Sequence, residues 1–374
     1  MPTMSPRPFT LQIPDPAIAD LKERLARTRW PDEPPLEPWS TGTSVGYAQE
    51  LAEYWRTGFD WRVWEAKLNA FRQFTVPLGG IDLHFIHEPG RGPSPMPLLV
   101  AHGWPGSVFE FHKLIGLLTE HFTVVAPSLP GYTLSFKPGQ KRFGVQEIAA
   151  VLAGLMTDVL GYRRWGAQGG DWGAFVASVM GHRYPERLAG IHLNLLAVRR
   201  DPAMLQSPTP EEKVYLAQLD HFLKEETGYQ WIQGTRPQTL AFGLTDSPAG
   251  LLAWIAEKFR AWTDNAGSPE DAVSRDEMLA NASLYWFTGA IGSSFWPYYA
   301  RMHGPWPIPE GQTVAVPMGY AEFPKEILRP PRSLAEKTYT DIRRWSAMPK
   351  GGHFAALEQP DALAREVAEF FRGL

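Results

Sequence analysis

Residues 166–173 read GAQGGDWG, and this stretch decides the fold. It lies between a predicted strand, Arg164 to Ala167, and a predicted helix, Trp172 to Tyr184. Small residues two positions before and two positions after a central side chain are what a sharp strand-to-helix turn needs. Such a turn presents its central residue at the end of a strand, so Asp171 is the first candidate for a reactive group.

The identity of the central residue decides the chemistry. Turns of this kind normally carry serine in the pattern G-x-S-x-G, and here Gly169-x-Asp171-x-Gly173 keeps the spacing with aspartate. A carboxylate nucleophile attacks an sp3 carbon and forms an alkyl-enzyme ester, whereas serine would be acylated. The alternative is that Asp171 only caps the helix that follows it, because aspartate is a good N-cap residue.

Outward from this turn, short apolar strands alternate with helices. This alternation predicts an α/β protein with a mostly parallel central sheet that helices cover on both faces. A β-hairpin is expected before it, with strands Phe74 to Leu78 and Ile81 to His87 joined by a two-residue glycine turn. The further strands are expected at Pro97 to Ala101, Thr123 to Ala126, Leu188 to Leu195, Thr313 to Pro317 and Ile342 to Met348, and the further helices at Val108 to Glu120, Val145 to Leu160 and Asp361 to Phe371.

The alternation is interrupted, and the interruption suggests the domain organisation. Residues 201–305 are helical and rich in polar and aromatic residues, so they read as a helical cap inserted into a core formed by residues 76–200 and 306–374. Residues 1–75 read as an N-terminal segment that wraps around this body, with a helix starting at Asp15-Pro16, where Asp15 is the expected N-cap.

Composition excludes several classes of protein. The chain has 374 residues, no cysteine and a net charge of −4, so thiolate metal sites, disulfide scaffolds and cysteine nucleophiles are excluded, and nucleic-acid binding is not expected. No stretch approaches the roughly 18 apolar residues of a membrane-spanning helix, and the N-terminus lacks the apolar core of a signal peptide. A cytoplasmic protein without a membrane anchor is the expectation.

Two loops provide candidates for the groups that would assist Asp171. The loop His102-Gly103-Trp104 follows the strand that ends at Ala101, and a loop in this place supplies one backbone N–H to an oxyanion hole while the residue after the nucleophile supplies the other. The expected donors are therefore the backbone N–H groups of Trp104 and Trp172. His102 is expected to organise its loop and not to act as the base.

The base and its acid are expected late in the chain. His353 lies in Gly351-Gly352-His353, a loop between the last strand and the last helix, and glycine pairs leave the backbone free to present the imidazole. Glu322 and Glu326 both follow the expected strand at 313–317. The order nucleophile, acid, histidine fits either carboxylate.

At this point the chain resembles the epoxide hydrolases of the α/β-hydrolase fold, and among them the microsomal-type branch. The resemblance extends from Pro8 to Phe371, and several motifs together make it specific. They are Arg29-Trp30-Pro31, HGWPGS at 102–107, SLPGY at 128–132, GGDWG at 169–173, FPKE at 323–326 and GGHFAALEQP at 351–360. Microsomal members carry an N-terminal hydrophobic anchor, and the chain as given begins at the soluble segment, so it looks like a soluble bacterial-type relative.

The resemblance assigns roles to individual residues. It places the nucleophile on Asp171, the base on His353 and the charge-relay acid on Glu326 rather than Glu322. It also matches two cap tyrosines to Tyr229 and Tyr298, with the neighbouring Tyr299 as an alternative. Tyrosine suits this role because epoxide opening releases an alkoxide, which needs a proton donor.

The implied reaction converts a small hydrophobic epoxide and water into a vicinal diol, with no metal and no organic cofactor. Aromatic residues of the cap are candidates for an apolar substrate pocket, and each could equally pack the cap against the sheet. They are Trp231, Phe242, Trp286, Phe287, Phe295 and Trp296. The oligomeric state is left open, with the aromatic N-terminal segment as the candidate for a homodimer contact.

Three other functions compete with this interpretation. A haloalkane dehalogenase uses the same aspartate nucleophile and activated water, and Trp172 could bind the halide through its indole N–H. It needs no proton donor, so the two tyrosines favour the epoxide. A serine esterase is disfavoured because residue 171 is Asp and no G-x-S-x-G occurs, and a non-catalytic binding protein because nucleophile, acid and base are all present.

Overall fold

Nine strands form one sheet in the computed structural model, which describes residues 5–199 and 201–374. The strand order is β1-β2-β3-β5-β4-β6-β7-β8-β9; β1, β2, β3 and β5 are antiparallel neighbours, and from β5 to β9 all pairs are parallel. The strands are β1 Arg7–Pro8, β2 Gln73–Leu78, β3 Ile81–Glu88, β4 Met96–Ala101, β5 Phe122–Pro127, β6 Trp165–Gly169, β7 Leu188–Leu193, β8 Met318–Glu322 and β9 Ile342–Ala347. The structure is therefore the mostly parallel α/β sheet that the sequence predicts.

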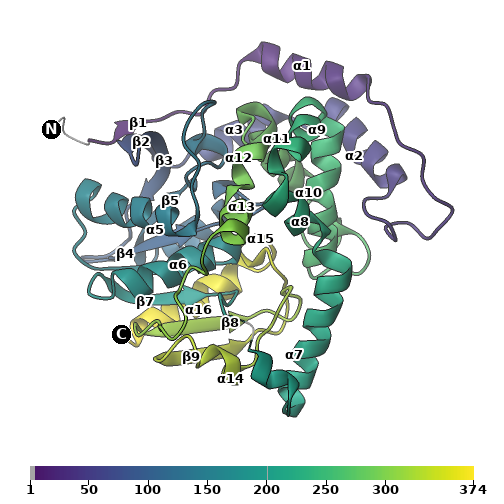
Figure 1. Cartoon of the computed structure of the whole chain (residues 1–374). Helices are drawn as coiled ribbons and strands as arrows, with labels where there is room; N and C mark the ends of the chain where they lie inside the picture. Colours follow the sequence, from purple (N-terminus) through teal and green to yellow (C-terminus); the bar gives the residue numbers. More distant parts are fainter. Residues whose placement is uncertain (1–4, 200) are drawn as a thin grey trace.

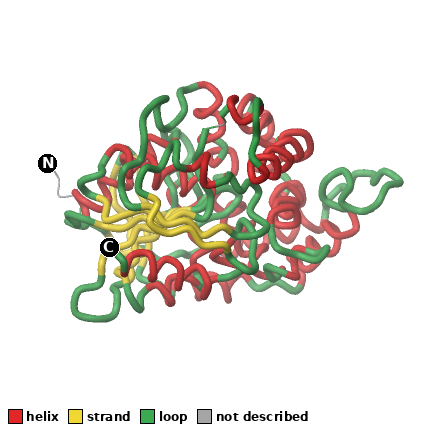
Figure 2. Tube along the Cα trace, turned by 90° about the horizontal axis from the view of Figure 1, so that it is seen from below, coloured by secondary structure: helices red, strands yellow, loops and turns green. Residues whose placement is uncertain are grey.

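Both faces of the sheet are buried, because alternate side chains of a strand point to opposite faces. In β4, Leu99 and Ala101 join the larger apolar core, and Leu98 and Val100 join the smaller one. Helices α5 and α6 border the larger core, and α4 and α16 border the smaller. Figure 2 shows helices on both sides of the strands.

The helices divide into groups along the chain. Three lie between β1 and β2: α1 Asp15–Ala26, α2 Val45–Thr57 and α3 Trp61–Asn69. The core helices are α4 Leu114–Leu118, α5 Val145–Gly154, α6 Asp171–Arg183, α14 Arg332–Ala335, α15 Ala355–Glu358 and α16 Pro360–Arg372. Between β7 and β8 come α7 Pro210–His221, α8 Gly228–Thr235, α9 Pro237–Asp246, α10 Pro248–Trp262, α11 Arg275–Thr288, α12 Ile291–Ser294 and α13 Trp296–His303.

The N-terminal helices lie against the helices of this insertion, as Figure 1 shows for α1 and α2. The indole N–H of Trp55 donates to Ser283 Oγ of α11 at 3.0 Å, and the Thr43 hydroxyl donates to the backbone carbonyl of Ala253 in α10 at 2.7 Å. The same segment also contributes to the sheet, because its first element, β1, pairs with β2. Residues 1–4 and residue 200, at the predicted segment boundaries, lie outside the described residues.

Three predictions of local structure are wrong. The strand expected at 313–317 does not form there, and the strand of this region, β8, starts five residues later. Pro317 has no N–H to donate to the ladder, and only its carbonyl takes part, by accepting from the Ile191 N–H. The helix expected at Val108 to Glu120 is a 3₁₀ turn, Val108–Phe111, followed by α4. Asp15 is the first residue of α1 rather than its N-cap, and its carboxylate pairs with Arg62.

No helix in the described part of the chain is both long enough and apolar enough to cross a membrane.

Candidate active site

Asp171 sits on the turn between β6 and α6 with a backbone φ of +46°, in the left-handed region that residues other than glycine rarely adopt. Such a conformation costs on the order of 1–3 kcal/mol and persists only where its surroundings enforce it. The close approach of the α6 backbone to β4 is one such constraint, since a Cβ at Gly173 would lie 1.9 Å from the carbonyl oxygen of Ala101. The turn that the glycines predicted is therefore present.

One oxygen of Asp171 is held by the loop after β4. The backbone N–H of Trp104 donates to Asp171 Oδ1 at 2.7 Å, so this amide lies where an oxyanion donor would have to be. The Trp172 amide belongs to the first turn of α6, where backbone N–H groups have no partner within the helix. Its role as the second donor stays a prediction.

The loop that carries Trp104 is fixed from two sides. On the cap side, the Asn281 side chain donates to the carbonyl of Pro105 at 2.8 Å, and the Tyr285 hydroxyl donates to the carbonyl of Gly106 at 2.6 Å. On the core side, His102 Nε2 accepts from the Leu129 backbone N–H at 3.0 Å. Burial lowers the pKa of His102 to about 4, so this imidazole is neutral and organises the loop, as expected.

His353 lies between Asp171 and Glu326. Its Nδ1 is 2.6 Å from Glu326 Oε1, and its Nε2 is 3.4 Å from Asp171 Oδ2. Burial lowers the pKa of the imidazole, but the charges of Glu326 and Asp171 outweigh it, so the pKa of His353 lies well above its usual value. The structure thus brings together the nucleophile, base and acid that the sequence predicted from three distant loops.

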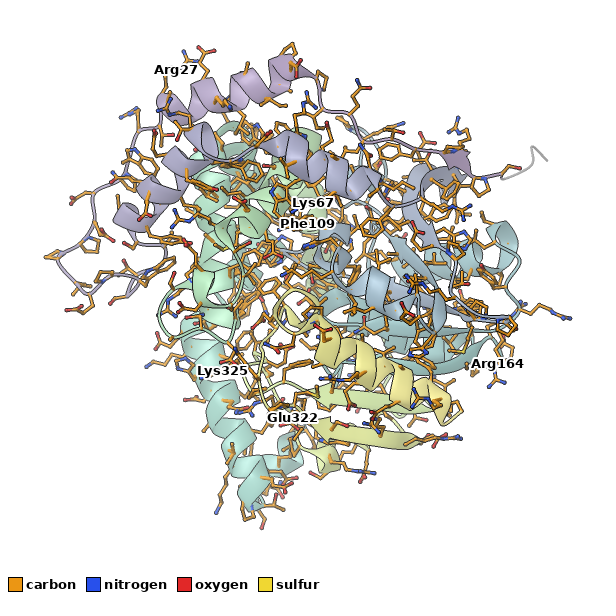
Figure 3. All side chains as sticks on the ribbon, turned by 180° about the vertical axis from the view of Figure 1, so that it is seen from behind. Arg27, Lys67, Phe109, Arg164, Glu322 and Lys325 are labelled. Carbon is orange, nitrogen blue, oxygen red and sulfur yellow. The ribbon has the colours of Figure 1, made fainter. Side chains whose placement is uncertain are left out.

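Glu322 is placed elsewhere. The Trp345 indole N–H donates to Glu322 Oε2 at 3.2 Å, and Arg329 lies 3.8 Å from the other oxygen. Glu322 is the last residue of β8, and Figure 3 labels it together with Lys325, which lies in the loop that follows the strand. Glu326 comes one residue after Lys325, so of the two carboxylates that the sequence left open, Glu326 is the one that meets His353.

Tyr229 of α8 and Tyr298 of α13 face each other beside Trp104. Their ring centroids are 5.7 Å apart, and both rings contact the Trp104 indole, Tyr229 stacked at 5.3 Å and Tyr298 edge-on at 5.8 Å. Tyr299 instead stacks on Trp296 and His303, at 4.7 and 4.0 Å. Tyr298 is therefore the tyrosine of α13 that belongs to the site.

Both phenols are buried and close enough to Asp171 to feel its charge. Burial, and after it the charge of Asp171, raises the pKa of Tyr229 above its usual value; burial, Tyr229 and Asp171 raise the pKa of Tyr298 likewise. Both tyrosines are therefore protonated at neutral pH and able to donate. Lys258, only 5% exposed, places its ammonium 4.4 Å from the centre of the Tyr229 ring.

The cap also holds the loop that carries His353. The backbone N–H of His353 donates to the carbonyl of Trp262 at 2.9 Å, and the Gly351 N–H donates to the Asp264 carboxylate at 2.9 Å. The Glu358 carboxylate accepts three backbone N–H groups, from Gly352 at 2.9 Å, Phe354 at 3.0 Å and Asp264 at 2.8 Å. We call this set of contacts, made by residues 262–264, 351–354 and 358, the cap–histidine clamp.

The predicted lining residues of the cap behave differently from one another. Trp231 and Phe242 are 60% and 75% exposed at the surface. Phe287 packs on Trp61 of the N-terminal segment. Of these four, Phe295 is the one that is buried against Trp104, with ring centroids 6.1 Å apart.

Several residues at the site escaped the sequence reasoning. Trp262 contacts both Tyr229 and His353, at 5.3 and 5.1 Å, and Glu358 accepts the three amides described above. The signal for Glu358 was present in the segment 351–360, where a carboxylate follows the glycine pair by six residues. Trp262 and Lys258 gave no such signal, because only the folded cap brings α10 to the site.

Two family models match the chain. The model described as "Epoxide hydrolase N terminus" matches residues 6–111, and the model described as "alpha/beta hydrolase fold" matches residues 96–230. The two matches overlap at the loop that carries Trp104.

Similar proteins cover almost the whole chain. A protein of Stigmatella aurantiaca (strain DW4/3-1) named "Putative epoxide hydrolase" is 45% identical over 98% of this chain and 85% of its own length. Epoxide hydrolase 1 of Oryctolagus cuniculus is 37% identical over 97% of this chain and 88% of its own. The crystal structure of juvenile hormone epoxide hydrolase from Bombyx mori superposes with a TM-score of 0.89 at 31% identity, covering 99% of this chain and 95% of that one.

Proposed function

Because the chain belongs to the epoxide hydrolase family, which converts an epoxide and water into a diol, we propose that it does so through an ester on Asp171. The observation that carries this proposal is the position of the carboxylate, which meets the Trp104 amide with one oxygen and faces His353 with the other. A carboxylate held in this way is oriented for attack on carbon, and the groups needed to release it again are in place.

In the first half-reaction, Tyr229 and Tyr298 hold the epoxide oxygen and polarise a C–O bond. An oxygen of Asp171 attacks the ring carbon, the C–O bond breaks, and one tyrosine gives its proton to the leaving alkoxide. The product is a hydroxyalkyl ester of Asp171. Both tyrosines are buried beside Trp104, which supports a role as donors in a site with little competing water.

In the second half-reaction, His353 takes a proton from water while the water oxygen attacks the carbonyl carbon of the ester. The negative charge collects on the carbonyl oxygen of the ester, and the Trp104 and Trp172 amides stabilise it there. The intermediate collapses by breaking its bond to the diol oxygen, which takes the proton from the imidazolium of His353, and the restored carboxyl group of Asp171 passes its own proton to His353 to regenerate the resting state. Glu326 stabilises the imidazolium and fixes the ring through the 2.6 Å contact at Nδ1.

Charge couples the two half-reactions. In the resting enzyme two carboxylates keep the pKa of His353 high, so the imidazole is protonated and is no base. Esterification neutralises Asp171 and leaves Glu326 as the one partner, so the pKa falls. The proton that His353 gives up returns to the tyrosine that became a phenolate in the first half-reaction, so the base is free when the ester that it must hydrolyse has formed.

The substrate class follows from the aromatic surroundings of Asp171. Rings of Trp104, Trp172, Tyr229, Trp262 and Tyr298 contact one another around the nucleophile, which favours a small, hydrophobic epoxide. A cytoplasmic location and a homodimer are also proposed. The dimer would use a surface other than the aromatic residues Trp55, Trp61 and Trp64, since all three are buried within the chain.

The test is a single turnover in water labelled with heavy oxygen, with enzyme in excess over a styrene-type epoxide. The first diol should contain oxygen from Asp171, hence unlabelled, while the label enters the protein. Immediate appearance of solvent label in the diol would reject the ester. Asp171→Ala, checked for folding, should form no diol.

A second assay addresses the haloalkane alternative. The two tyrosines have no role when halide leaves as a stable anion, so chloro- and bromoalkanes should release no halide under conditions in which the epoxide is consumed. Halide release at a comparable rate would favour a dehalogenase.

A further inference from the structure

A small cavity adjoins Asp171 and His353 on the core side of the site. Its wall includes both of these residues together with Glu110, Gln168 and Asn194, and none of its lining residues comes from 201–305. The two tyrosines, in contrast, belong to α8 and α13 of the cap. Asp171 therefore borders a space on the core side that the two tyrosines do not line.

The size of this space fits one water molecule. It offers about 20 Å³ to the centre of a water-sized sphere, and roughly 10–15 Å³ is enough to hold one water. A water in such a place needs two to four polar partners. An organic epoxide is too large for it, so the cavity is suited to the second substrate of the reaction.

Polar groups for that water are available on the cavity wall. Gln168 is 1% exposed and donates to Asn194 at 2.8 Å, while its Oε1 has no partner among the described residues. Glu110 brings a carboxyl group into the same wall and interacts with the charges of both His353 and Asp171. His353 supplies the third group.

The carboxyl of Glu110 is built into the loop that carries Trp104. Its Oε1 fills the space that a Cβ at position 106 would need, at 1.2 Å from that point, so glycine at 106 leaves room for it. Burial raises the pKa of Glu110 to about 8, so at neutral pH the group is mostly uncharged and does not repel Asp171. A neutral carboxyl still accepts a hydrogen bond through its carbonyl oxygen.

We propose that Glu110 is a positioning residue that holds the hydrolytic water between itself, Gln168 and His353. The inference rests on the proposed ester on Asp171. The water donates one hydrogen to the Glu110 or Gln168 oxygen and the other to His353 Nε2, which leaves a lone pair for the ester carbon. When the C–O bond forms, that second proton passes to His353, and Glu110 keeps its own protonation state.

The experiment measures the two half-reactions separately in Glu110→Leu, Glu110→Asp and Glu110→Gln. Rapid acid quench followed by intact-protein mass spectrometry gives the fraction of enzyme that carries the epoxide as ester. Glu110→Leu should slow ester hydrolysis about 100-fold, so that the ester accumulates, while ester formation changes less than threefold. Glu110→Asp, whose carboxyl is one methylene shorter, should slow hydrolysis about tenfold. Glu110→Gln keeps an acceptor and should be slowed less than Glu110→Leu.

The matched control is Glu120→Leu, an exposed glutamate of the same region, which should leave both steps unchanged. Glu110→Asp keeps the test decisive if the leucine variant does not fold. The inference is overturned if the Glu110 variants hydrolyse the ester at the wild-type rate, if both steps slow equally, or if Gln is as slow as Leu. A wild type that never carries ester and takes solvent oxygen at once would instead overturn the proposed function, so the two failures are distinct.

Discussion

Two adjacent tyrosines on α13 have opposite surroundings, and this difference provides a sharp test. Tyr298 contacts Trp104, Trp172 and Tyr229, whereas Tyr299 stacks on Trp296 and His303. Tyr298→Phe should lower kcat/KM about 10–100-fold, with residual activity because the proposed donor role is shared with Tyr229. Tyr299→Phe, the matched control one residue away, should change it less than twofold in the same steady-state assay. Equal losses in both variants would contradict the assignment.

The charge coupling at His353 makes a prediction about pH. In the resting enzyme the neighbouring carboxylates hold the pKa of the imidazole well above its usual value. In the ester, with Asp171 neutral, the pKa should be lower, and hydrolysis should slow as the pH falls through that lower value, because a protonated imidazole is no base. Ester decay in single turnovers gives the second pKa, and NMR titration of the imidazole gives the first.

An ester-decay pKa equal to or above that of the resting enzyme would refute the coupling. His353→Gln should accumulate the ester at every pH. Steady turnover by this variant without an adduct would mean that His353 is not the base.

Among single residues, the sequence predicted those that carry their own local signal. Asp171 and His353 lie in glycine-rich turns, and both occur where they were expected. Glu326 could not be separated from Glu322 by spacing alone, because the difference is which way each side chain points, and only the family motif preferred one. Lys258 and Trp262 were not predictable, because their position depends on how α10 packs on the core.

At the scale of elements, the cap–histidine clamp joins the end of α10 and the two residues after it to the loop before α15 and to Glu358, the last residue of α15. Burial raises the pKa of Glu358 to about 7, while the three backbone N–H groups it accepts favour its charged form. Glu358→Gln should lower the free energy of unfolding by about 2–4 kcal/mol, because a single amide oxygen cannot serve all three donors and its NH₂ group faces them. It should also slow ester hydrolysis more than ester formation, since His353 loses its fixed loop.

Urea unfolding and quench experiments measure these two effects. The exposed Glu211→Gln on α7 is the control and should change neither. A Glu358→Gln enzyme as stable as the wild type would show that the three amides are satisfied without the carboxylate.

Element boundaries show where periodicity stops being informative. The parallel strands from β4 to β7 were found because both of their faces are buried and the sequence is a short apolar run. The error at 313–317 arose because that segment is equally apolar, with Val314 and Val316 buried although it forms only a bridge to Tyr339. An apolar run of sequence indicates that a segment is buried, and it does not distinguish a strand from a buried loop between two elements.

For the molecule as a whole, the N-terminal segment and the helical insertion support each other. Trp55 is 1% exposed and its indole donates to Ser283 of the insertion. Trp55→Ala should lower the free energy of unfolding by about 3–5 kcal/mol, because it removes a large buried side chain and leaves the hydroxyl without its donor. Trp231→Ala, at a tryptophan that is 60% exposed, should cost less than about 1 kcal/mol.

Denaturant unfolding followed by circular dichroism compares the two tryptophan variants directly. If the N-terminal segment were an independent appendage, Trp55→Ala would loosen it while leaving the main transition in place. A single shifted transition with an unchanged slope is the expected result.

The cap–histidine clamp also limits how this fold can be rearranged. Since residues 262–264 hold the His353 loop, an exchange of the 201–305 insertion for that of another hydrolase would remove the Trp262 carbonyl and the Asp264 carboxylate from the loop that carries the proposed base. The insertion therefore cannot be exchanged as a unit that only determines substrate specificity, because it also holds the His353 loop in place. Recombination that keeps residues 248–264 together with Tyr229 of α8 and Tyr298 of α13 would retain these contacts and both proposed proton donors, and it leaves the rest of the insertion open to change.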